Sequence, residues 1–557
     1  MNEEILELKK EIERLKKAVK EQRYGLNWID VPEAFEDDVE NKLPILKEAE
    51  GNEIINNDTK PTHILIEGDN YHALTCLNYT HREKIDFIYI DPPYNTGNDG
   101  FVYKDKRILD RYPDGSPVPK DNPFRHSYWL SFMKKRLELA KTLLKETGVI
   151  FISIDNNEIS QLKLLCDEIF GEDNFESFIW KKKGGAGNTE RIIGNLTEYI
   201  LCYFKNKKPG IFNYRTIERV YKHKDGKGPY NLEGIEKTNL GGYERKTMQF
   251  PIVDPKTKKK FFPGTNMRWT IGEKNAKKAI EQGRIYFDYK KSKVYIIKRP
   301  KDYEESENVF YNLLLDAGSL ATAKDELYDF FGNREIFDTP KPTSLIRQLL
   351  EIASSKNHIV LDFFAGSGTT AQAVLELNEV DNGERQFIVC TDNENNICQK
   401  ICYPRIKKVI NGYLNPDGEK VKGLGNSLKY YKTNFIGKHN IKRVIDEDKV
   451  ELAYHAGELL AVAENTLYKV SKNRHYQFFK TKSNANEHYT GVYFREELNK
   501  FDEFVKRVEK LKSLVTVYVF SWGQGEFIDE FSHCNNVTVK NIPLPILAIY
   551  KEIYNLH

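Results

Sequence analysis

The sequence predicts an α/β fold built on a buried, mostly parallel sheet. Three observations predict it. The chain alternates strand, helix and strand between residues 61 and 90, which is a βαβ pattern. The last of these strands, 85–90, is rich in Ile, Phe and Tyr, as buried strands are. Further along, residues 358–370 read as another strand that passes through a small-residue turn into a helix.

The strand at 85–90 is followed directly by Asp91-Pro92-Pro93-Tyr94. The prolines end the strand because neither offers a backbone N–H to the ladder. Asp91 and Tyr94 therefore lie at a strand's carboxyl end, where open α/β sheets bind ligands. A carboxylate and a flat ring on a rigid loop can hold a planar base by its amine and stack on it. A plain strand-ending turn is the alternative, since Asp-Pro pairs are common at turns.

The second motif follows the strand at 358–362 and contains two glycines. Its residues are Asp362, Phe363, Phe364, Ala365, Gly366, Ser367, Gly368 and Thr369. Gly366 and Gly368 let a ligand approach the backbone closely, and the next helix offers free N–H groups at its start. No Gly-Lys-Ser/Thr follows, so this is not a nucleoside triphosphate loop. With Asp362 and the aromatic pair, it looks like the S-adenosylmethionine loop of a methyltransferase.

The remaining elements follow from apolar periodicity. We expect helices near 70–80, 126–146, 157–170, 369–378 and 395–409, and further strands at 149–155, 199–204 and 386–391. The sheet should be interrupted after about 206 and resume only at 358–362. The long polar loop 95–124 follows the first motif, and loops of that length are usually functional.

The interrupting segment, 206–336, is rich in Lys, Arg, Tyr and Phe. The runs 256–262 and 289–295 interleave cations with aromatic rings, and Lys181–Asn188 is a basic, glycine-bearing loop. Such patches have two interpretations. They are solvated hairpins, in which lysines on the edge strands prevent pairing with other strands, or they contact nucleic-acid phosphates.

Two terminal segments complete the chain. Residues 3–23 read as an amphipathic helix that either packs on its own domain or pairs two chains. Residues 436–557 mix strands such as 516–520 with helices such as 494–512, and they carry no recognisable catalytic grouping. Scaffolding or partner docking is the modest expectation for this last unit.

Composition sets the remaining bounds. A chain of 557 residues implies several domains. A net charge of only +3 means that any contact with nucleic acid must come from local patches. The seven cysteines form no Cys-x-x-Cys pair, so we expect no metal site, and reduced thiols fit a cytoplasmic protein. No run approaches the roughly 18 apolar residues of a membrane span.

With both motifs in view, the chain resembles the amino-methylating DNA methyltransferases. The Asp-Pro-Pro-Tyr motif precedes the Phe-x-Gly-Ser-Gly loop, which resembles the β arrangement of that family. Segments 64–70 and 337–342 look like those that lead into the two motifs. Further stretches resemble the Mod subunits of type III restriction-modification systems, namely 24–28, 42–47, 393–398 and 423–427.

The resemblance implies a Rossmann-like S-adenosylmethionine-dependent methyltransferase sheet with an inserted target-recognition domain and an α+β C-terminal domain. The expected divisions are 1–50 for a helical or dimerisation segment, 51–205 for the catalytic half, 206–336 for target recognition, 337–435 for the cofactor-binding half and 436–557 for the C-terminal domain.

The resemblance also implies transfer of a methyl group from S-adenosylmethionine to adenine N6. The implied catalytic residues are Asp91, Pro92, Pro93 and Tyr94. Asp91 and the Pro92 carbonyl would accept hydrogen bonds from the amine, and Tyr94 would stack on the extruded base. The implied cofactor-binding residues are Asp69, Lys341, Asp362, Phe363, Phe364, Ala365, Gly366, Ser367, Gly368, Thr369 and Glu394. Asp69 and Glu394 could equally be helix caps.

The implied partners are double-stranded DNA, a second copy of the chain and a separate helicase-nuclease restriction subunit. One alternative is a solitary adenine or cytosine-N4 methyltransferase without a nuclease. Another is a DNA-binding specificity subunit that has lost catalysis, which the intact motifs oppose. A protein-glutamine methyltransferase is a further option, but those enzymes usually carry Asn in place of Asp91 and place the cofactor loop first.

Overall fold

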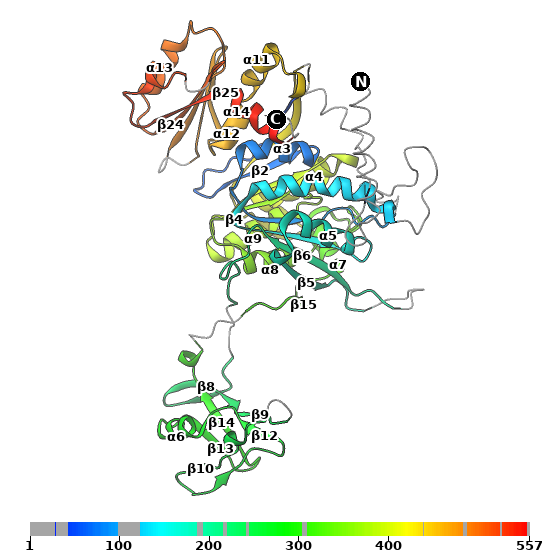
Figure 1. Cartoon of the computed structure of the whole chain (residues 1–557), viewed down its shortest axis with the longest axis vertical. Coiled ribbons are helices and arrows are strands. Elements are labelled where there is room, and N and C mark those ends of the chain that lie inside the picture. The colour runs from blue at the N-terminus through cyan, green and yellow to red at the C-terminus, as the bar shows by residue number, and fades with distance from the viewer. Residues whose placement is uncertain are drawn as a thin grey trace, which may run out of the picture. The chain divides into compact units, whose positions relative to one another are not determined.

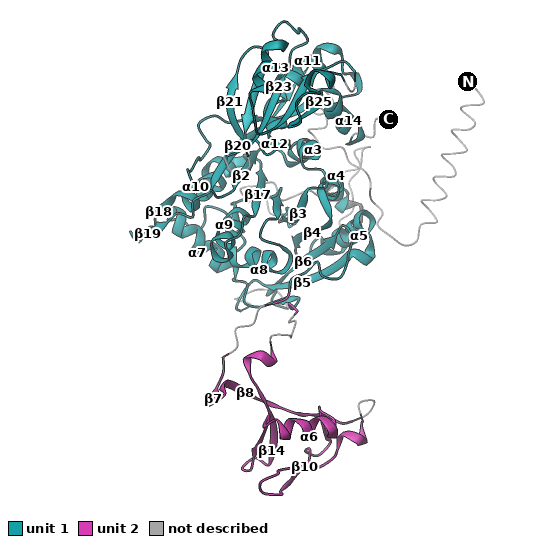
Figure 2. Ribbon diagram, turned by 90° about the vertical axis from the view of Figure 1, so that its left-hand side faces the viewer, with its two compact units in different colours: residues 1–213, 311–557 teal, residues 214–310 magenta. Residues whose placement is uncertain are grey.

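The computed structural model describes residues 28, 43–97, 123–185, 193–215, 220–240, 244–303, 309–437, 439, 441–482, 487–523 and 526–553. The expected N-terminal helix and most of the loop 95–124 lie outside the described residues. The chain divides into two compact units, residues 1–213 with 311–557 and residues 214–310 (Figure 2). No helix in the described ranges is long and apolar enough to cross a bilayer.

A ten-stranded sheet forms the centre of the first unit (Figure 1). In spatial order its strands are β1 (Leu43–Glu48), β20 (Ser427–Ile436), β2 (Thr62–Glu67), β17 (Gln386–Thr391), β16 (Ile359–Asp362), β3 (Ile85–Ile90), β4 (Leu144–Ile154), β6 (Thr197–Phe204), β5 (Phe175–Lys181) and β15 (Leu313–Leu314). The six strands from β20 to β4 are parallel. Parallel strands are covered on both faces, which is why β3 is buried throughout and apolar except for Asp86, which pairs with Lys145.

The strands β16 and β3 are direct neighbours, although they lie far apart in the chain. They pair in parallel, with Val360 opposite Phe87 and Leu361 opposite Ile88. Their carboxyl ends therefore lie at the same edge of the sheet, and the turn after β3 and the loop after β16 open there together. The expected α/β sheet and the convergence of the two motif-bearing loops are confirmed.

Helices cover both faces of this sheet. They are α3 (Asn70–Thr80), α4 (Ser127–Leu143), α5 (Ile159–Phe170), α7 (Leu320–Phe331), α8 (Thr343–Ala353), α9 (Thr369–Asp381) and α10 (Tyr403–Asn411). The crossovers β16–α9–β17 and β3–α4–β4 run in opposite directions along the sheet. Because such crossovers are right-handed, α9 and α4 lie on opposite faces. Helix α9 contacts α8 and α10, whereas α4 contacts α3 and α5.

Several expected boundaries are wrong. The single helix expected at 395–409 is instead a 3₁₀ turn at Glu394–Asn396, a π turn at Cys398–Cys402 and then α10. Asn395 and Asn396 have positive φ angles of 49° and 64°, which no right-handed helix accommodates. Pro404, in the first turn of α10, has no N–H to donate to the preceding turn.

The sheet does not resume only at 358–362, because β15 adds two residues in parallel to β5. Strands β1 and β20 also extend the opposite edge, where they pair with each other antiparallel. A two-residue strand has too few positions to show any periodicity, so β15 leaves no sequence pattern.

The C-terminal part of the first unit contains a second, five-stranded sheet. Its strands are β21 (Tyr468–Lys472), β22 (Tyr476–Lys480), β23 (His488–Tyr493), β24 (Leu514–Phe520) and β25 (Val537–Ile542), with helices α11 (Asp446–His455), α12 (Gly457–Ala463), α13 (Phe501–Glu509) and α14 (Leu544–Ile553). Helices α12 and α14 contact α3, and the Tyr550 hydroxyl donates to the Pro44 carbonyl at 2.8 Å. This part therefore shares a hydrophobic core with the ten-stranded sheet.

The helix α13 is shorter than the expected 494–512. Phe494 is buried and its N–H donates to the His475 carbonyl at 3.1 Å, so the hairpin contact of β23 continues past its last residue. The helix begins only after Lys500, with Asp502 and Glu503 in its first turn, where acidic side chains are favoured.

The second unit, residues 214–310, has its own small core. It contains β7 (His223–Asp225), β8 (Gly228–Gly234), β9 (Glu236–Thr238), β10 (Ile252–Val253), β11 (Lys260–Phe261), β12 (Met267–Trp269), α6 (Glu273–Glu281), β13 (Ile285–Asp288) and β14 (Lys293–Lys298). The buried residues Ile252, Phe261, Trp269 and Val294 belong to that core. Strand β15 and helix α7, which fall inside the segment 206–336, belong to the first unit.

Candidate active site

A cavity of about 290 Å³ opens at the edge of the sheet where β3 and β16 end. It lies wholly within the first unit, and all of the predicted site residues except Gly368 line it. Other lining residues were not predicted, among them Asp155, Lys182 and Glu198. One pocket thus joins the turn after β3 to the glycine loop after β16.

The Asp91 carboxylate forms an ion pair with Lys341 at this cavity. The Lys341 ammonium lies 2.8 Å from both Asp91 oxygens, and the Tyr94 hydroxyl donates to Oδ1 at 2.7 Å. Burial raises the pKa of Asp91, and Lys341 opposes that rise. The sequence placed Lys341 among the cofactor residues, whereas the structure places its ammonium against Asp91.

Glu198 is a buried carboxylate beside this pair that sequence reasoning missed. It is 5% exposed on β6 and accepts hydrogen bonds from Lys182 at 3.1 Å and from Tyr94 Oη at 3.3 Å. Burial opposes ionisation, but Lys341 and Lys182 outweigh it and lower the pKa of Glu198. The available signal was an acidic residue at the start of an otherwise apolar strand.

The glycine loop needs its glycines for backbone geometry. Gly366 has a φ of 49° and Gly368 a φ of 82°, in the left-handed region that favours glycine. Within the loop, Asp362 accepts hydrogen bonds from the Phe364 N–H at 2.9 Å and the Thr370 hydroxyl at 2.5 Å. Burial raises the pKa of Asp362 to about 7.

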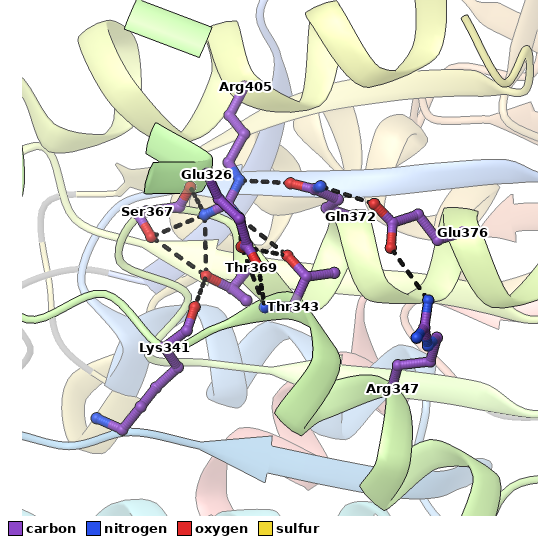
Figure 3. Close-up of polar contacts among 9 residues, drawn as sticks. All are labelled: Glu326, Lys341, Thr343, Arg347, Ser367, Thr369, Gln372, Glu376 and Arg405. Atoms are coloured by element: carbon purple, nitrogen blue, oxygen red, sulfur yellow. Dashed lines mark hydrogen bonds and ion pairs between the residues drawn. The ribbon is translucent and has the colours of Figure 1, made fainter. Parts of the chain in front are cut away.

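A buried arginine that does not line the cavity forms hydrogen bonds to this loop (Figure 3). Arg405, on α10, is fully buried and donates to Ser367 Oγ, Thr369 Oγ1, Gln372 Oε1, Thr343 Oγ1 and Glu326 Oε2 at 2.8–3.2 Å. Thr369 in turn donates to the Lys341 carbonyl at 3.2 Å. The network therefore ties the glycine loop to the backbone of the lysine that pairs with Asp91.

Asp69 is a helix cap that also faces the cavity. Its side chain accepts from the Tyr71 N–H at 2.8 Å and so caps α3. The neighbouring Asn70 accepts from the buried Arg136 and donates to the Phe363 carbonyl at 2.8 Å. The start of α3 thus braces the glycine loop. Glu394 lines the cavity from its 3₁₀ turn.

The turn at 91–94 and the residue after it are fixed by Trp129, Glu158 and His126. The Trp129 indole N–H donates to the Pro93 carbonyl at 2.7 Å. Glu158 is 1% exposed and accepts from the Asn95 amide at 2.6 Å. It also bonds His126 Nδ1 at 2.7 Å, and this contact raises the pKa of His126. The turn is therefore held rigidly on the edge of the sheet.

A parallel sheet with a glycine loop and a carboxylate turn on one cavity defines an S-adenosylmethionine-dependent methyltransferase. Residues 85–403 match the DNA methylase family, which is more than half of the chain. The chain belongs to that family.

Curated relatives include Mod subunits of type III restriction-modification enzymes and a type II methyltransferase. The chain is 36% identical over 391 residues to the StyLTI Mod subunit of a type III restriction-modification enzyme from Salmonella typhimurium, covering 66% of this chain and 58% of that one. It is 32% identical to the EcoPI Mod subunit from Escherichia phage P1, covering 71% and 67%. It is 33% identical to the type II methyltransferase M.KpnI from Klebsiella pneumoniae, covering 62% and 86%.

The methyl donor of this family is S-adenosylmethionine, and the cavity fits it. The donor carries a sulfonium and an ammonium, so it suits a site with an excess of carboxylates. Asp69, Asp362, Asp392 and Glu394 line the cavity, and the two lysines there, Lys341 and Lys182, are paired with Asp91 and Glu198. A Cβ on Gly366 would lie 3.1 Å from the Phe337 ring, so a larger residue there would require the ring to shift.

Proposed function

We propose that this chain is the modification subunit of a type III restriction-modification system. In this proposal it methylates adenine N6 within a specific DNA sequence. One observation carries the proposal: the Asp91 turn and the glycine loop open onto the same cavity. The chain spans 58% of the StyLTI subunit and 67% of the EcoPI subunit, at 36% and 32% identity.

The chemistry follows from the weakness of the nucleophile. The lone pair of the adenine amine is delocalised into the ring, so the amine attacks poorly unless its nitrogen becomes pyramidal. Asp91 and the Pro92 carbonyl accept hydrogen bonds from the amine and stabilise the positive charge that develops on it. The Tyr94 ring stacks on the base after it leaves the duplex. When bound, S-adenosylmethionine supplies the electrophilic methyl group.

The second unit is the proposed target-recognition domain. Lys256, Lys258, Lys259 and Lys260 are exposed on it, and the Lys259 ammonium lies 5.2 Å from the Phe261 ring centroid. Phe262 is 57% exposed. Such lysines contact phosphates and set the salt dependence of binding. The same arrangement would also serve a solvated hairpin, so DNA binding by this unit is the point to test.

The remaining assignments concern partners and place. The Mod relatives support a separate restriction subunit, and the expected helix at 3–23 supports pairing of two chains. All seven cysteines are free of disulfides, which fits a cytoplasmic enzyme. A solitary methyltransferase is the second candidate, because the similarity to a type II methyltransferase, M.KpnI, covers 86% of that chain and does not by itself imply a type III restriction subunit.

The test is direct sequencing of modified DNA. Cells that lack other DNA methyltransferases would express the chain or Asp91→Ala, and long-read sequencing would detect modified bases. We expect N6-methyladenine at one sequence motif, and none with Asp91→Ala. Unmodified DNA with the wild-type chain would refute the proposal, and N4-methylcytosine would move the target to the other base. Co-purification with a helicase-nuclease from the adjoining gene separates a type III subunit from a solitary enzyme.

A further inference from the structure

We propose that Glu198 is a positioning residue that takes over the Lys341 ammonium when the target amine engages Asp91. This inference rests on the proposed function, because it describes how the site admits its base. It names a carboxylate that lies outside both sequence motifs.

The need for such a group follows from the Asp91 ion pair. Both Asp91 oxygens are engaged by Lys341 at 2.8 Å. An amine that hydrogen bonds to Asp91 therefore competes with the ammonium for these oxygens and weakens the ion pair. Lys341 is only 5% exposed, so bulk water is not at hand to replace the lost contact. A displaced buried ammonium without a partner would oppose base entry strongly.

A second carboxylate is already within reach of this ammonium. Glu198 Oε2 lies 3.6 Å from Lys341 Nζ, beyond hydrogen-bond distance but inside ion-pair range. A small rotation about the lysine side chain would close that gap. The position of Glu198 is fixed because it lies on a paired strand, with Trp180 opposite it on β5. The acceptor is therefore preorganised rather than carried on a loop.

The transfer leaves the net charge around Asp91 unchanged. Asp91 and Glu198 supply two negative charges, and Lys341 and Lys182 supply two positive ones. The adenine amine is neutral, so its arrival at Asp91 changes no charge. Lys341 moves from one carboxylate to the other and remains paired throughout. The lowered pKa of Glu198 is consistent with a carboxylate that stays ionised for this role.

Tyr94 supports the same reading. Its hydroxyl donates to Asp91 at 2.7 Å and also lies 3.3 Å from Glu198. If the amine replaces this hydroxyl at Asp91, Glu198 can keep the hydroxyl bonded while the ring stacks on the base. Glu198 thus lies beside both donors that Asp91 releases. A neutral amide could accept from the hydroxyl but could not neutralise the ammonium.

The test compares Glu198→Gln with Glu198→Asp in the full-length chain. Glutamine keeps the shape and the hydrogen-bonding oxygen but removes the charge, whereas aspartate keeps the charge on a shorter arm. We expect Glu198→Gln to slow single-turnover methylation about tenfold or more, and Glu198→Asp to retain more of the rate. Calorimetric affinity for S-adenosylmethionine should stay within about twofold of wild type in both, because the substitution acts at the base side of the cavity.

Base capture provides a readout that is independent of methyl transfer. A duplex with 2-aminopurine next to the methylated adenine would be mixed with S-adenosylhomocysteine and each variant, so that the target base keeps its N6 amine and the probe brightens when that base leaves the stack. We expect a weaker rise in fluorescence with Glu198→Gln than with wild type. The matched control is Glu464→Gln, which removes a partly buried, lysine-paired carboxylate from the C-terminal part and should change neither rate nor fluorescence.

Two results would overturn the inference. One is a Glu198→Gln variant that methylates at the wild-type rate. The other is equal loss in the glutamine and aspartate variants, which would show that the charge is not what matters. A wild-type chain that modifies no DNA would instead refute the proposed function. Thermal melting of each variant shows whether it folds, and Glu198→Asp keeps the comparison usable if the glutamine variant does not.

Discussion

Replacing Gly368 by alanine tests whether the glycine loop must hold its present backbone to bind the cofactor. Gly368 is the N-cap of α9, with φ 82° and ψ 22°. A Cβ there would lie 3.2 Å from Cys402 Sγ and 3.4 Å from the Cys402 carbonyl. The substitution therefore brings two costs, which are a left-handed backbone for a residue with a side chain and a tight contact against the π turn.

The magnitude follows from the backbone cost. A left-handed conformation costs an L-residue about 1–2 kcal/mol, and relaxation around the sulfur adds to it. If the free loop escapes this strain by moving, binding must restore the present geometry. The Kd for S-adenosylmethionine should then rise about 5- to 30-fold, since about 1.4 kcal/mol is a factor of ten.

Gly332 offers a matched control. It also has a left-handed backbone, with φ 67°, but the nearest atom to its Cβ would be Pro416 Cγ at 3.8 Å. Gly332→Ala carries the same backbone cost at the end of α7, and it does not line the cavity. We expect it to lower the melting temperature and leave cofactor affinity unchanged.

Isothermal titration calorimetry with S-adenosylmethionine measures both variants. Adding Cys402→Ala to Gly368→Ala should recover part of the affinity, because it removes the sulfur that the new Cβ meets. Wild-type affinity in Gly368→Ala would refute the reasoning, as would an equal loss in Gly332→Ala.

Three further predictions concern the carboxylates and the second unit. Burial raises the pKa of Asp362 to about 7, so this carboxyl is protonated at a higher pH in the folded protein than in the unfolded chain. The positive charge of the cofactor ammonium favours the ionised carboxylate. Cofactor affinity should therefore rise from about pH 6 to about pH 8, and calorimetry that finds the same rise in Asp362→Asn would contradict this. Asp91→Ala should abolish methylation but leave DNA affinity within about twofold, as measured by fluorescence anisotropy. A larger loss of affinity would contradict this and show that Asp91 also contacts the duplex. Lys259→Gln should reduce the slope of log K against log salt by about one, and an unchanged slope would exclude a phosphate contact.

The central part of the fold was predictable because buried parallel strands leave strong signals. The strands β3, β16 and β17 are largely apolar in sequence. Two prolines mark the end of β3, and a loop with two glycines follows β16. That the two motifs serve one site followed from the family resemblance and from the rule that ligands bind at the carboxyl ends of strands, whereas the direct pairing of β3 with β16 is known only from the structure. The expected lining of one cavity by both motifs needed no side-chain detail.

The parts that escaped prediction depend on contacts between distant segments. Nothing in the local sequence indicates that β1 pairs with β20, because an edge strand is specified by its partner. The role of Arg405 is likewise invisible in the sequence, where it reads as one of several cations in a polar helix. Its burial is compensated by acceptors from α7, α8 and the glycine loop, which are brought together only by the fold.

The topology explains how a catalytic site can tolerate a large insertion in the middle of its domain. The distance between Asp91 and the glycine loop is set by the pairing of β3 with β16, and by Lys341 and Thr369, which bond across it. None of these contacts involves the chain between β6 and β15, where residues 214–310 are inserted. The strands that flank the insertion are β6 and β15, which are two and four places from β3 in the sheet order. The surface of the inserted unit can therefore change without altering the β3–β16 register that brings the Asp91 turn and the glycine loop together.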